Sequence, residues 1–210
     1  MKIPIFAHVA AISYIVPAYF SVRMWKHLDR SLKGFAVFSI ISVGQTIAEF
    51  VLGRLGIHNQ FLLNYYQLIE FVFVMYLFFY WAESGFFKEG IQYITMIYVL
   101  TWMIYKFYFE DPDKFSEVIA PLSSFFFIIV SGYSLIQLFQ SATTIISKTP
   151  MFWFSTGVFL YSAGTIIIFL FSNAILAMGI EYFNALWHVN WAFTLIANFC
   201  FSKGFWCTKL

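Results

Sequence analysis

The chain carries little charge for its size. Asp, Glu, Lys and Arg make up only 10% of its 210 residues, whereas soluble domains contain roughly 25%. Hydrophobic residues make up 61% of the chain, and a water-soluble fold of this length has too small an interior to bury so much apolar surface. The composition therefore excludes a soluble globular protein. The net charge of +2 comes with no dense run of basic residues, so nucleic acid is not expected as a partner.

Cysteine and histidine are also scarce. The two cysteines are Cys200 and Cys207, which a helix would hold about 10 Å apart, too far for a disulfide. The four histidines are scattered and include no His-x-x-x-His pair that would place two metal ligands on one helix face. No nucleophile–base pair is recognisable either. We therefore expect no metal site, no cofactor and no enzymatic activity.

Apolar residues are gathered in seven stretches of similar length. Each is about as long as the roughly 20 helical residues needed to cross a hydrocarbon core of ~30 Å. The stretches are continuous rather than alternating, which favours helices over a membrane β-barrel. The sequence thus predicts an all-α, polytopic bundle of seven transmembrane helices in a single domain, residues 1–210. The predicted spans are residues 3–22, 35–53, 61–82, 91–109, 118–139, 151–173 and 185–206.

The basic residues predict an orientation for these spans. The connection after the first span, residues 23–33, contains four basic residues and one acidic residue. By the positive-inside rule this connection is cytoplasmic, which places the N-terminus outside and the C-terminus inside. The acidic connection of residues 110–117 then falls outside. We expect a multi-pass protein whose first partner is the lipid bilayer.

Two carboxyl groups, those of Glu49 and Glu70, fall inside the predicted spans. An ionisable group within a span is costly and is therefore a candidate functional group. Other polar residues accompany each glutamate at helical spacing, which builds a polar stripe along each helix. The stripes are Ser42, Gln45, Thr46 and Glu49 in the second span, and Asn64, Gln67 and Glu70 in the third.

The helix rise places the two stripes at matching depths. Counted from the outer boundary, Glu49 lies roughly 6 Å deep, near the level of Asn64, while Gln45 and Glu70 lie roughly 12–14 Å deep. The last span brings three more polar residues, His188, Asn190 and Thr194, to similar depths. We expect these side chains to form a site that opens outward, above an aromatic and sealed inner half. The candidate ligand-binding or proton-carrying residues are Glu49, Glu70, Gln45, Asn64, Gln67, His188 and Asn190.

Two further patterns concern the shape and packing of the helices. Gly157 and Gly164 recur seven residues apart in the sixth span, and small residues let membrane helices approach closely. Pro17 and Pro121 predict kinks in the first and fifth spans.

Two segments of the chain resemble known proteins. They are residues 151–164, with the sequence MFWFSTGVFLYSAG, and the closing helix, with LWHVNW at 186–191 and KGFW at 203–206. Both are similar to small, uncharacterised seven-helix inner-membrane proteins of bacteria, which are often associated with two-component signalling. The resemblance implies a sensor-like protein of the bacterial cytoplasmic membrane, and it supplies no site residues.

The leading functional hypothesis is a sensory or regulatory membrane protein. It would bind a small cationic or hydrogen-bonding ligand in the polar site and signal through a partner protein, because a ligand favours the helix arrangement that binds it better. The alternative is a small-solute transporter or a proton-coupled channel in which Glu70 carries the proton. An intramembrane enzyme and a purely structural subunit, whose polar side chains only join helices at about 0.6 kcal/mol each, also remain open.

Overall fold

The computed structural model describes residues 4–57, 59–109, 116–141 and 145–209, and no strand occurs among them. Two short 3₁₀ helices, Trp25–His27 and Ile146–Lys148, lie in connections. Most of the acidic connection, residues 110–115, lies outside the described residues. The helices are α1 Ile5–Ser13, α2 Ile15–Arg23, α3 Arg30–Arg54, α4 Gln60–Trp81, α5 Gly85–Tyr108, α6 Ile119–Ser141, α7 Pro150–Leu170, α8 Ser172–Met178 and α9 Ile180–Cys207.

Local sequence signals set several of the helix ends. Asp29 caps α3, because its Oδ1 accepts a hydrogen bond from the Leu32 N–H at 2.8 Å and so satisfies one of the free donors of the first turn. Pro150 begins α7 at the first helical position, where no helical hydrogen bond needs its missing N–H. Gly179, with φ 130°, separates α8 from α9 in a conformation that residues with a side chain rarely adopt.

The first predicted span is divided into two helices at Tyr14. The cause is Pro17, which offers no N–H to the carbonyl of Ser13 and whose ring crowds that carbonyl. The kink predicted at Pro17 is therefore confirmed. The kink predicted at Pro121 is wrong, because α6 runs without interruption and Pro121 lies in its first turn, where the N–H has no helical partner to lose.

All seven predicted spans are helical. Within the described ranges, five helical segments are long and apolar enough to cross a membrane, namely α1 with α2, α3, α4, α6 and α7. The other two spans contain α5, of 24 residues, and α9, of 28 residues. A helix of 24 residues is about 36 Å long, but tyrosine, tryptophan, asparagine and charged residues lower the mean hydropathy of α5 and α9. The helical bundle is as predicted, while the count of seven spans and their orientation stay predictions.

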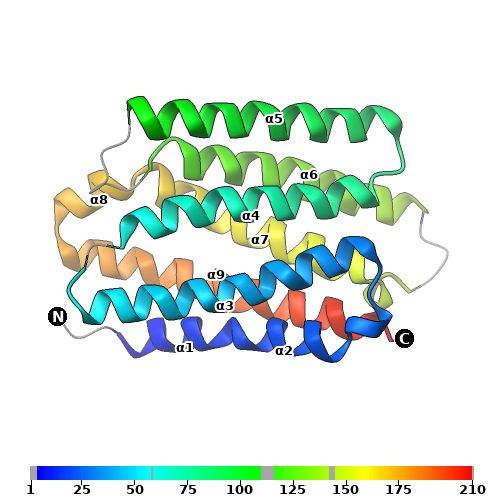
Figure 1. The fold of residues 1–210 in the computed structure, drawn as a ribbon, viewed down its shortest axis with the longest axis horizontal. Coiled ribbons are helices and arrows are strands. Elements are labelled where there is room, and N and C mark those ends of the chain that lie inside the picture. The colour runs from blue at the N-terminus through cyan, green and yellow to red at the C-terminus, as the bar shows by residue number, and fades with distance from the viewer. Residues whose placement is uncertain (1–3, 58, 110–115, 142–144, 210) are drawn as a thin grey trace.

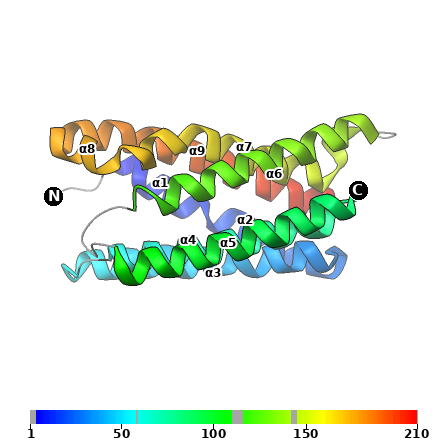
Figure 2. The same ribbon diagram turned by 90° about the horizontal axis from the view of Figure 1, so that it is seen from above.

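The contacts between the long helices close a ring, and α5 lies outside it at one edge of the bundle (Figure 1). Around the ring, α2 packs against α3, α3 against α4, α4 against α6, α6 against α7, α7 against α9, and α9 against α1 and α2. Helix α5 packs against α4 and α6. Figure 2 shows two layers, with α6, α7 and α9 in one and α3, α4 and α5 in the other. Side chains from six sides therefore meet inside the ring.

Helices α7 and α9 approach closely at glycine residues. A Cβ atom placed on Gly157 of α7 would lie 2.8 Å from the Phe201 ring and 3.0 Å from the Cys200 Cβ of α9. Gly164 faces the ring of Phe193 in the same way. The prediction that Gly157 and Gly164 serve helix packing is confirmed.

Phenylalanine rings fill the ring of helices near the end that carries the C-terminus. The ring centroids of Phe35 and Phe154 are 4.9 Å apart, those of Phe35 and Phe201 5.0 Å, and those of Phe154 and Phe205 4.9 Å. All three pairs meet edge to face, a favourable arrangement for aromatic rings. We call these four residues the phenylalanine plug. They occupy the half of the bundle that the sequence predicts to be aromatic and sealed.

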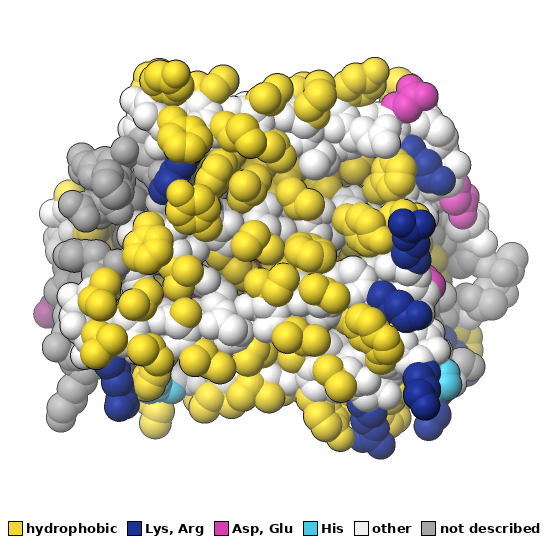
Figure 3. Space-filling model, in the orientation of Figure 1, with side chains coloured by type: hydrophobic (Ala, Val, Ile, Leu, Met, Phe, Trp, Pro, Cys, Tyr) yellow, Lys and Arg dark blue, Asp and Glu magenta, His cyan; other side chains and the backbone are white. Residues whose placement is uncertain are grey.

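The outer surface of the bundle is apolar. Figure 3 shows hydrophobic side chains spread over α3, α4 and α5, with most Lys and Arg side chains of this face at the end that carries the C-terminus. Continuous apolar exposure of this kind marks a surface that meets lipid or another protein. Helix α5 alone exposes Tyr93, Met96, Ile97, Leu100, Met103, Ile104 and Phe107.

Candidate functional site

A cavity of about 350 Å³ lies inside the ring, at the end that carries the N-terminus. We call it the wide chamber, and its volume is in the range of small-molecule sites. Gln60 and Ser172, the first residues of α4 and α8, line it together with Ser116 just before α6, so the chamber reaches the end of the bundle. The other polar lining residues are His8, Tyr14, Ser42, Gln45, Thr46, Glu49, Tyr66, Gln67, Glu70, Ser123, Ser124, Tyr161, Asn190 and Thr194.

Five of the seven predicted site residues line the wide chamber: Gln45, Glu49, Gln67, Glu70 and Asn190. Gln45 and Glu49 are one helical turn apart on α3, and Gln67 and Glu70 are about one turn apart on α4, so each pair projects from one side of its helix. The two polar stripes therefore meet across the chamber, and Asn190 reaches it from α9.

Two carboxyls and several side-chain amides contribute oxygen acceptors around the chamber. Glu49 accepts one hydrogen bond, from Gln45 Nε2 at 2.9 Å. The buried side-chain oxygens of Gln67 and Asn190 have no hydrogen-bond partner among the described residues. Buried polar groups in folded proteins nearly always have a partner. These two oxygens are enclosed by protein atoms and are not exposed to the chamber.

Positive charge is scarce around these acceptors. No Lys or Arg of the described ranges lines the wide chamber, and His8 is the one basic side chain among its described lining residues. The His8 ring packs edge to face against Phe50, with centroids 6.0 Å apart. Glu49 and Glu70 thus face a cavity that contains no fixed cation to balance them. A carboxylate removed from bulk water needs a counter-charge, hydrogen bonds or a proton.

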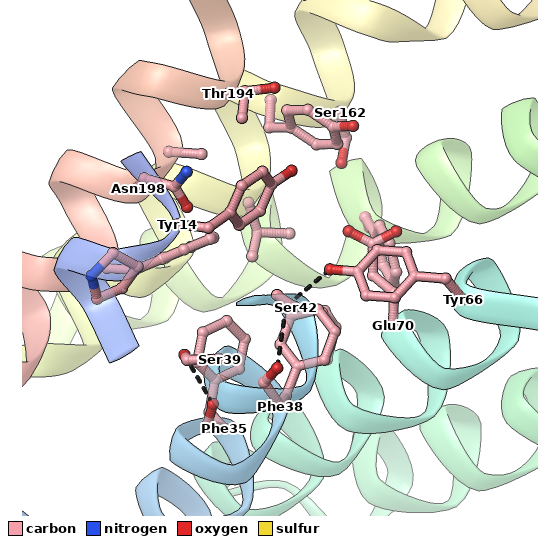
Figure 4. A pocket seen from close by; sticks show the side chains of 17 residues that line it. Tyr14, Phe35, Phe38, Ser39, Ser42, Tyr66, Glu70, Ser162, Thr194 and Asn198 are labelled. Carbon is pink, nitrogen blue, oxygen red and sulfur yellow. Dashed lines mark hydrogen bonds between the residues drawn. The ribbon is translucent and has the colours of Figure 1, made fainter. Parts of the chain in front are cut away.

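Three tyrosines separate the wide chamber from a second cavity. Tyr14, Tyr66 and Tyr161 line both cavities, and so does Glu70. We call these tyrosines the tyrosine collar. The second cavity, which we call the narrow chamber, has a volume of about 40 Å³, enough for water but not for a larger molecule. Figure 4 shows Tyr14, Tyr66 and Glu70 around this space.

Hydrogen bonds position two of the collar tyrosines. The Tyr66 hydroxyl lies 2.8 Å from Ser42 Oγ, and Ser42 donates its own hydrogen to the Phe38 carbonyl at 2.9 Å. Because a serine hydroxyl has one hydrogen, Tyr66 is the donor in its bond with Ser42. The hydrogen of Tyr66 is thus already used and does not reach Glu70.

The donor in the hydrogen bond of Tyr14 can be assigned in the same way as that of Tyr66. The Tyr14 hydroxyl is hydrogen-bonded to the side chain of Thr194 on α9. Thr194 donates its hydrogen to the Asn190 carbonyl at 2.9 Å, so Tyr14 is the donor. Both tyrosines therefore present only oxygen lone pairs to the neighbourhood of Glu70. Neither of these two tyrosines is thus a hydrogen-bond donor to the carboxyl of Glu70.

The narrow chamber continues the polar lining for a short distance beyond the collar. Ser162 lines it, and its hydroxyl has no hydrogen-bond partner among the described residues. Asn198 lines it from α9 and donates to Ser13 Oγ at 2.7 Å, which ties α9 to the end of α1. Phe35 and Phe201 of the phenylalanine plug form its floor. The plug closes the polar space toward the C-terminal end.

Two predicted site residues lie elsewhere. Asn64 is buried on α4 beside Trp102 and Tyr105 of α5, and its backbone carbonyl accepts a hydrogen bond from Trp102 Nε1 at 3.2 Å. His188 is exposed on α9, where its ring packs against Phe6 and Trp191 and its Nδ1 contacts the Asn184 carbonyl. The structure therefore does not bring Asn64 or His188 to the wide chamber.

The collar residue Tyr14 was not among the residues that the polar stripes select. Tyrosine is common in membrane helices, so its type alone carries little signal. A local signal does exist, because Tyr14 stands three residues before Pro17, where the helix must break. Tyr14 keeps helical backbone angles, φ −61° and ψ −24°, and its side chain lines both chambers.

No metal site is recognisable in the described part of the chain, because no group of three or more His, Cys, Asp or Glu side chains gathers there. No family model, no curated protein and no solved structure matches the chain.

Proposed function

We propose that the protein is a sensory or regulatory membrane protein that binds a small organic cation in the wide chamber. One observation carries this proposal. The carboxyls of Glu49 and Glu70 line a cavity that has no Lys or Arg among its described lining residues. Carboxylate oxygens accept hydrogen bonds and donate none, so they favour a ligand rich in N–H donors. A positive charge on that ligand compensates Glu49 and Glu70.

The chemistry of the lining narrows the class of ligand. Ammonium, amidinium and guanidinium groups combine positive charge with several N–H donors, which matches carboxylate and amide oxygens. Phe50, Trp187 and Trp191 also line the wide chamber, and aromatic faces attract cations. The proposed ligand is therefore a small amine or guanidine with an apolar portion. Because the narrow chamber beyond the collar is too small for such a molecule, the ligand stays on the side of the N-terminus.

The tyrosine collar supplies a route from binding to signal. A cation at Glu70 adjoins Tyr14, which stands at the break between α1 and α2. A ligand that binds more tightly to one arrangement of this break shifts the population toward that arrangement. Helix α2 leads into the basic connection of residues 23–33. We propose that this connection faces the cytoplasm of a bacterial cell, where a partner protein receives the signal.

A binding experiment tests the proposal. A panel of small alkylamines, diamines and guanidines is screened by thermal shift on the detergent-solubilised protein, with neutral amides of matched shape beside them. We expect a cation to stabilise the protein, and Glu70→Gln to weaken its binding at least about 30-fold, because removing one partner of a buried charge pair costs about 2 kcal/mol or more. Glu89→Gln, on the exposed face of α5, is the matched control. Binding that is equal for amines and amides, or unchanged in Glu70→Gln, would contradict the proposal.

A second candidate is a transporter or proton-coupled channel. The observation that favours it is the narrow chamber, which continues polar space past Glu70 to Asn198 and ends at the phenylalanine plug. In this reading the plug is the closed gate of one state, and Glu70 carries a proton or the cation between states. Reconstitution in liposomes separates the two functions. A transporter moves a bound amine down an imposed gradient, and Glu70→Gln abolishes that flux, whereas a sensor binds the amine without flux.

A further inference from the structure

A groove runs along the outside of the bundle, between α1–α2 and α9. Its volume is about 490 Å³. Val16 and Phe20 form one wall, and Leu195, Phe199 and Trp206 form the other. The groove is separate from the wide chamber and shares none of its residues. It lies on the surface that a membrane protein turns toward lipid.

The groove has the length of one bilayer leaflet. Its lining on α9 extends from Leu195 to Trp206, which is about 16 Å of helix. Half of a ~30 Å hydrocarbon core is about 15 Å. Leu195 is near the middle of α9 and Trp206 is near its end. The groove therefore extends from the middle of the membrane to the level of the headgroups, where tryptophan is favoured.

A single basic residue stands at the headgroup end of this groove. Lys203 lines it one turn before Trp206 and is half-buried. No carboxylate lines the groove among the described residues. A lysine beside apolar surface lays its stem along that surface and carries its ammonium toward the interface. The groove thus offers an apolar trough that ends in one uncompensated positive charge.

We propose that this groove binds one anionic phospholipid of the leaflet on the C-terminal side. One acyl chain lies between α1–α2 and α9, and the lipid phosphate pairs with Lys203. The charge selects an anionic over a zwitterionic lipid, and the length of the trough selects a single acyl chain of one leaflet. This proposal depends on membrane embedding but not on the cation site in the wide chamber.

The deep end of the groove adjoins the break in the first span. Ser13 and Asn198 line the groove there, and their hydrogen bond of 2.7 Å separates it from the narrow chamber. The terminal part of the acyl chain therefore packs against the residues that hold α1 to α9. A bound lipid supports the break from outside, on the opposite side from the tyrosine collar.

Lipid titration followed by native mass spectrometry tests this site. The detergent-solubilised protein is titrated with dioleoyl phosphatidylglycerol and, separately, with dioleoyl phosphatidylcholine. We expect the first phosphatidylglycerol to bind about fivefold more tightly than phosphatidylcholine, the effect of one basic residue on an anionic lipid. Lys203→Gln removes this preference, and Lys209→Gln, on an exposed lysine outside the groove, retains it.

A second variant tests the apolar part of the groove. Val16→Trp places a large ring in the trough, and we expect it to lower the binding of both lipids to a similar extent. Equal binding of the two lipids to the unmodified protein would overturn the proposal. So would an undiminished preference in Lys203→Gln, or full lipid binding in Val16→Trp. The binding of amines to the wide chamber is measured on the same variants and is expected to be unchanged in Lys203→Gln, so failure of either site is seen separately.

Discussion

Substitution of Gly157 by alanine tests the contact between α7 and α9, the helices that carry Tyr161 and Thr194 of the chamber lining. The new methyl would lie 2.8 Å from the Phe201 ring and 3.0 Å from the Cys200 Cβ. Neither neighbour can yield easily. The Cys200 Cβ is fixed to the helix backbone, and the Phe201 ring packs between Phe35 and Phe154 at centroid distances of 5.0 and 5.7 Å.

The expected change in the free energy of unfolding is the difference between the cost of overpacking and the gain in helix propensity. Overpacking a tight interior costs about 1–3 kcal/mol, and replacing glycine by alanine within a helix returns up to about 1 kcal/mol. Gly157→Ala is therefore expected to lower the free energy of unfolding by about 1–2 kcal/mol. For a chain of this size that lowers Tm by about 2–8 °C. Gly44→Ala, on α3, is the matched control, because a Cβ there meets nothing within 4 Å. The control is expected to leave Tm unchanged or raise it slightly.

The reaction of two buried cysteines can be used to follow unfolding. Cys200 and Cys207 are each only 4% exposed, so a dye that fluoresces on reaction with thiols reports their exposure during heating. Loss of helix signal in circular dichroism is followed in parallel, and the two midpoints should agree if unfolding is cooperative. If Gly157→Ala melts at the same temperature as Gly44→Ala, the close approach of α7 and α9 is refuted.

Three further predictions use other parts of the structure. Asp29→Ala removes the cap of α3 and is expected to lower the free energy of unfolding by about 1 kcal/mol, whereas Asp29→Asn, which keeps a capping oxygen, melts close to the unmodified protein. Trp102→Phe loses the hydrogen bond to the Asn64 backbone carbonyl and is expected to lower Tm. Amine binding should stay unchanged, because no residue of α5 lines either chamber. A loss of binding would show that α5 shapes the site. The orientation is tested by single cysteines in a variant without Cys200 and Cys207. A cysteine in place of Ile57 should react with a membrane-impermeant maleimide in intact cells, whereas a cysteine in place of Lys26 should react only after permeabilisation. The reverse pattern would invert the predicted orientation.

The sequence predicts the helices well because each apolar stretch must satisfy its own backbone in lipid. Details of the helix ends depend on single residues. The second predicted span begins at residue 35, but α3 begins at Arg30 because Asp29 caps it. The sixth predicted span extends to residue 173, but α7 ends at Leu170. Hydrogen bonds at the helix ends determine where the helices begin and stop, and hydropathy does not register them.

The candidate site is predicted in part, and helix geometry explains where the prediction stops. Gln45, Glu49, Gln67 and Glu70 share a chamber because steps of three and four residues stay near one side of a helix. Asn64 is six residues from Glu70, a rotation of about 120° around the helix, which turns it toward α5. His188 is two residues before Asn190, a rotation of about 200°, so both cannot face the chamber. Matching depth alone does not place two side chains in one site.

The break at Tyr14 would allow the short helix α1 to tilt as a rigid unit. Helix α1 has nine residues and is therefore about 13 Å long. It is joined to α2 at a point where regular backbone hydrogen bonding is interrupted. Helix α1 packs against α9, while α2 packs against both α3 and α9. A tilt of about 10° at Tyr14 would move the far end of a 13 Å rod by about 2 Å, carrying His8 and Ala7 toward or away from Glu49. Such a tilt would change the width of the chamber's opening from its deepest point, where the tyrosine collar, the Asn198–Ser13 bond and the external groove meet.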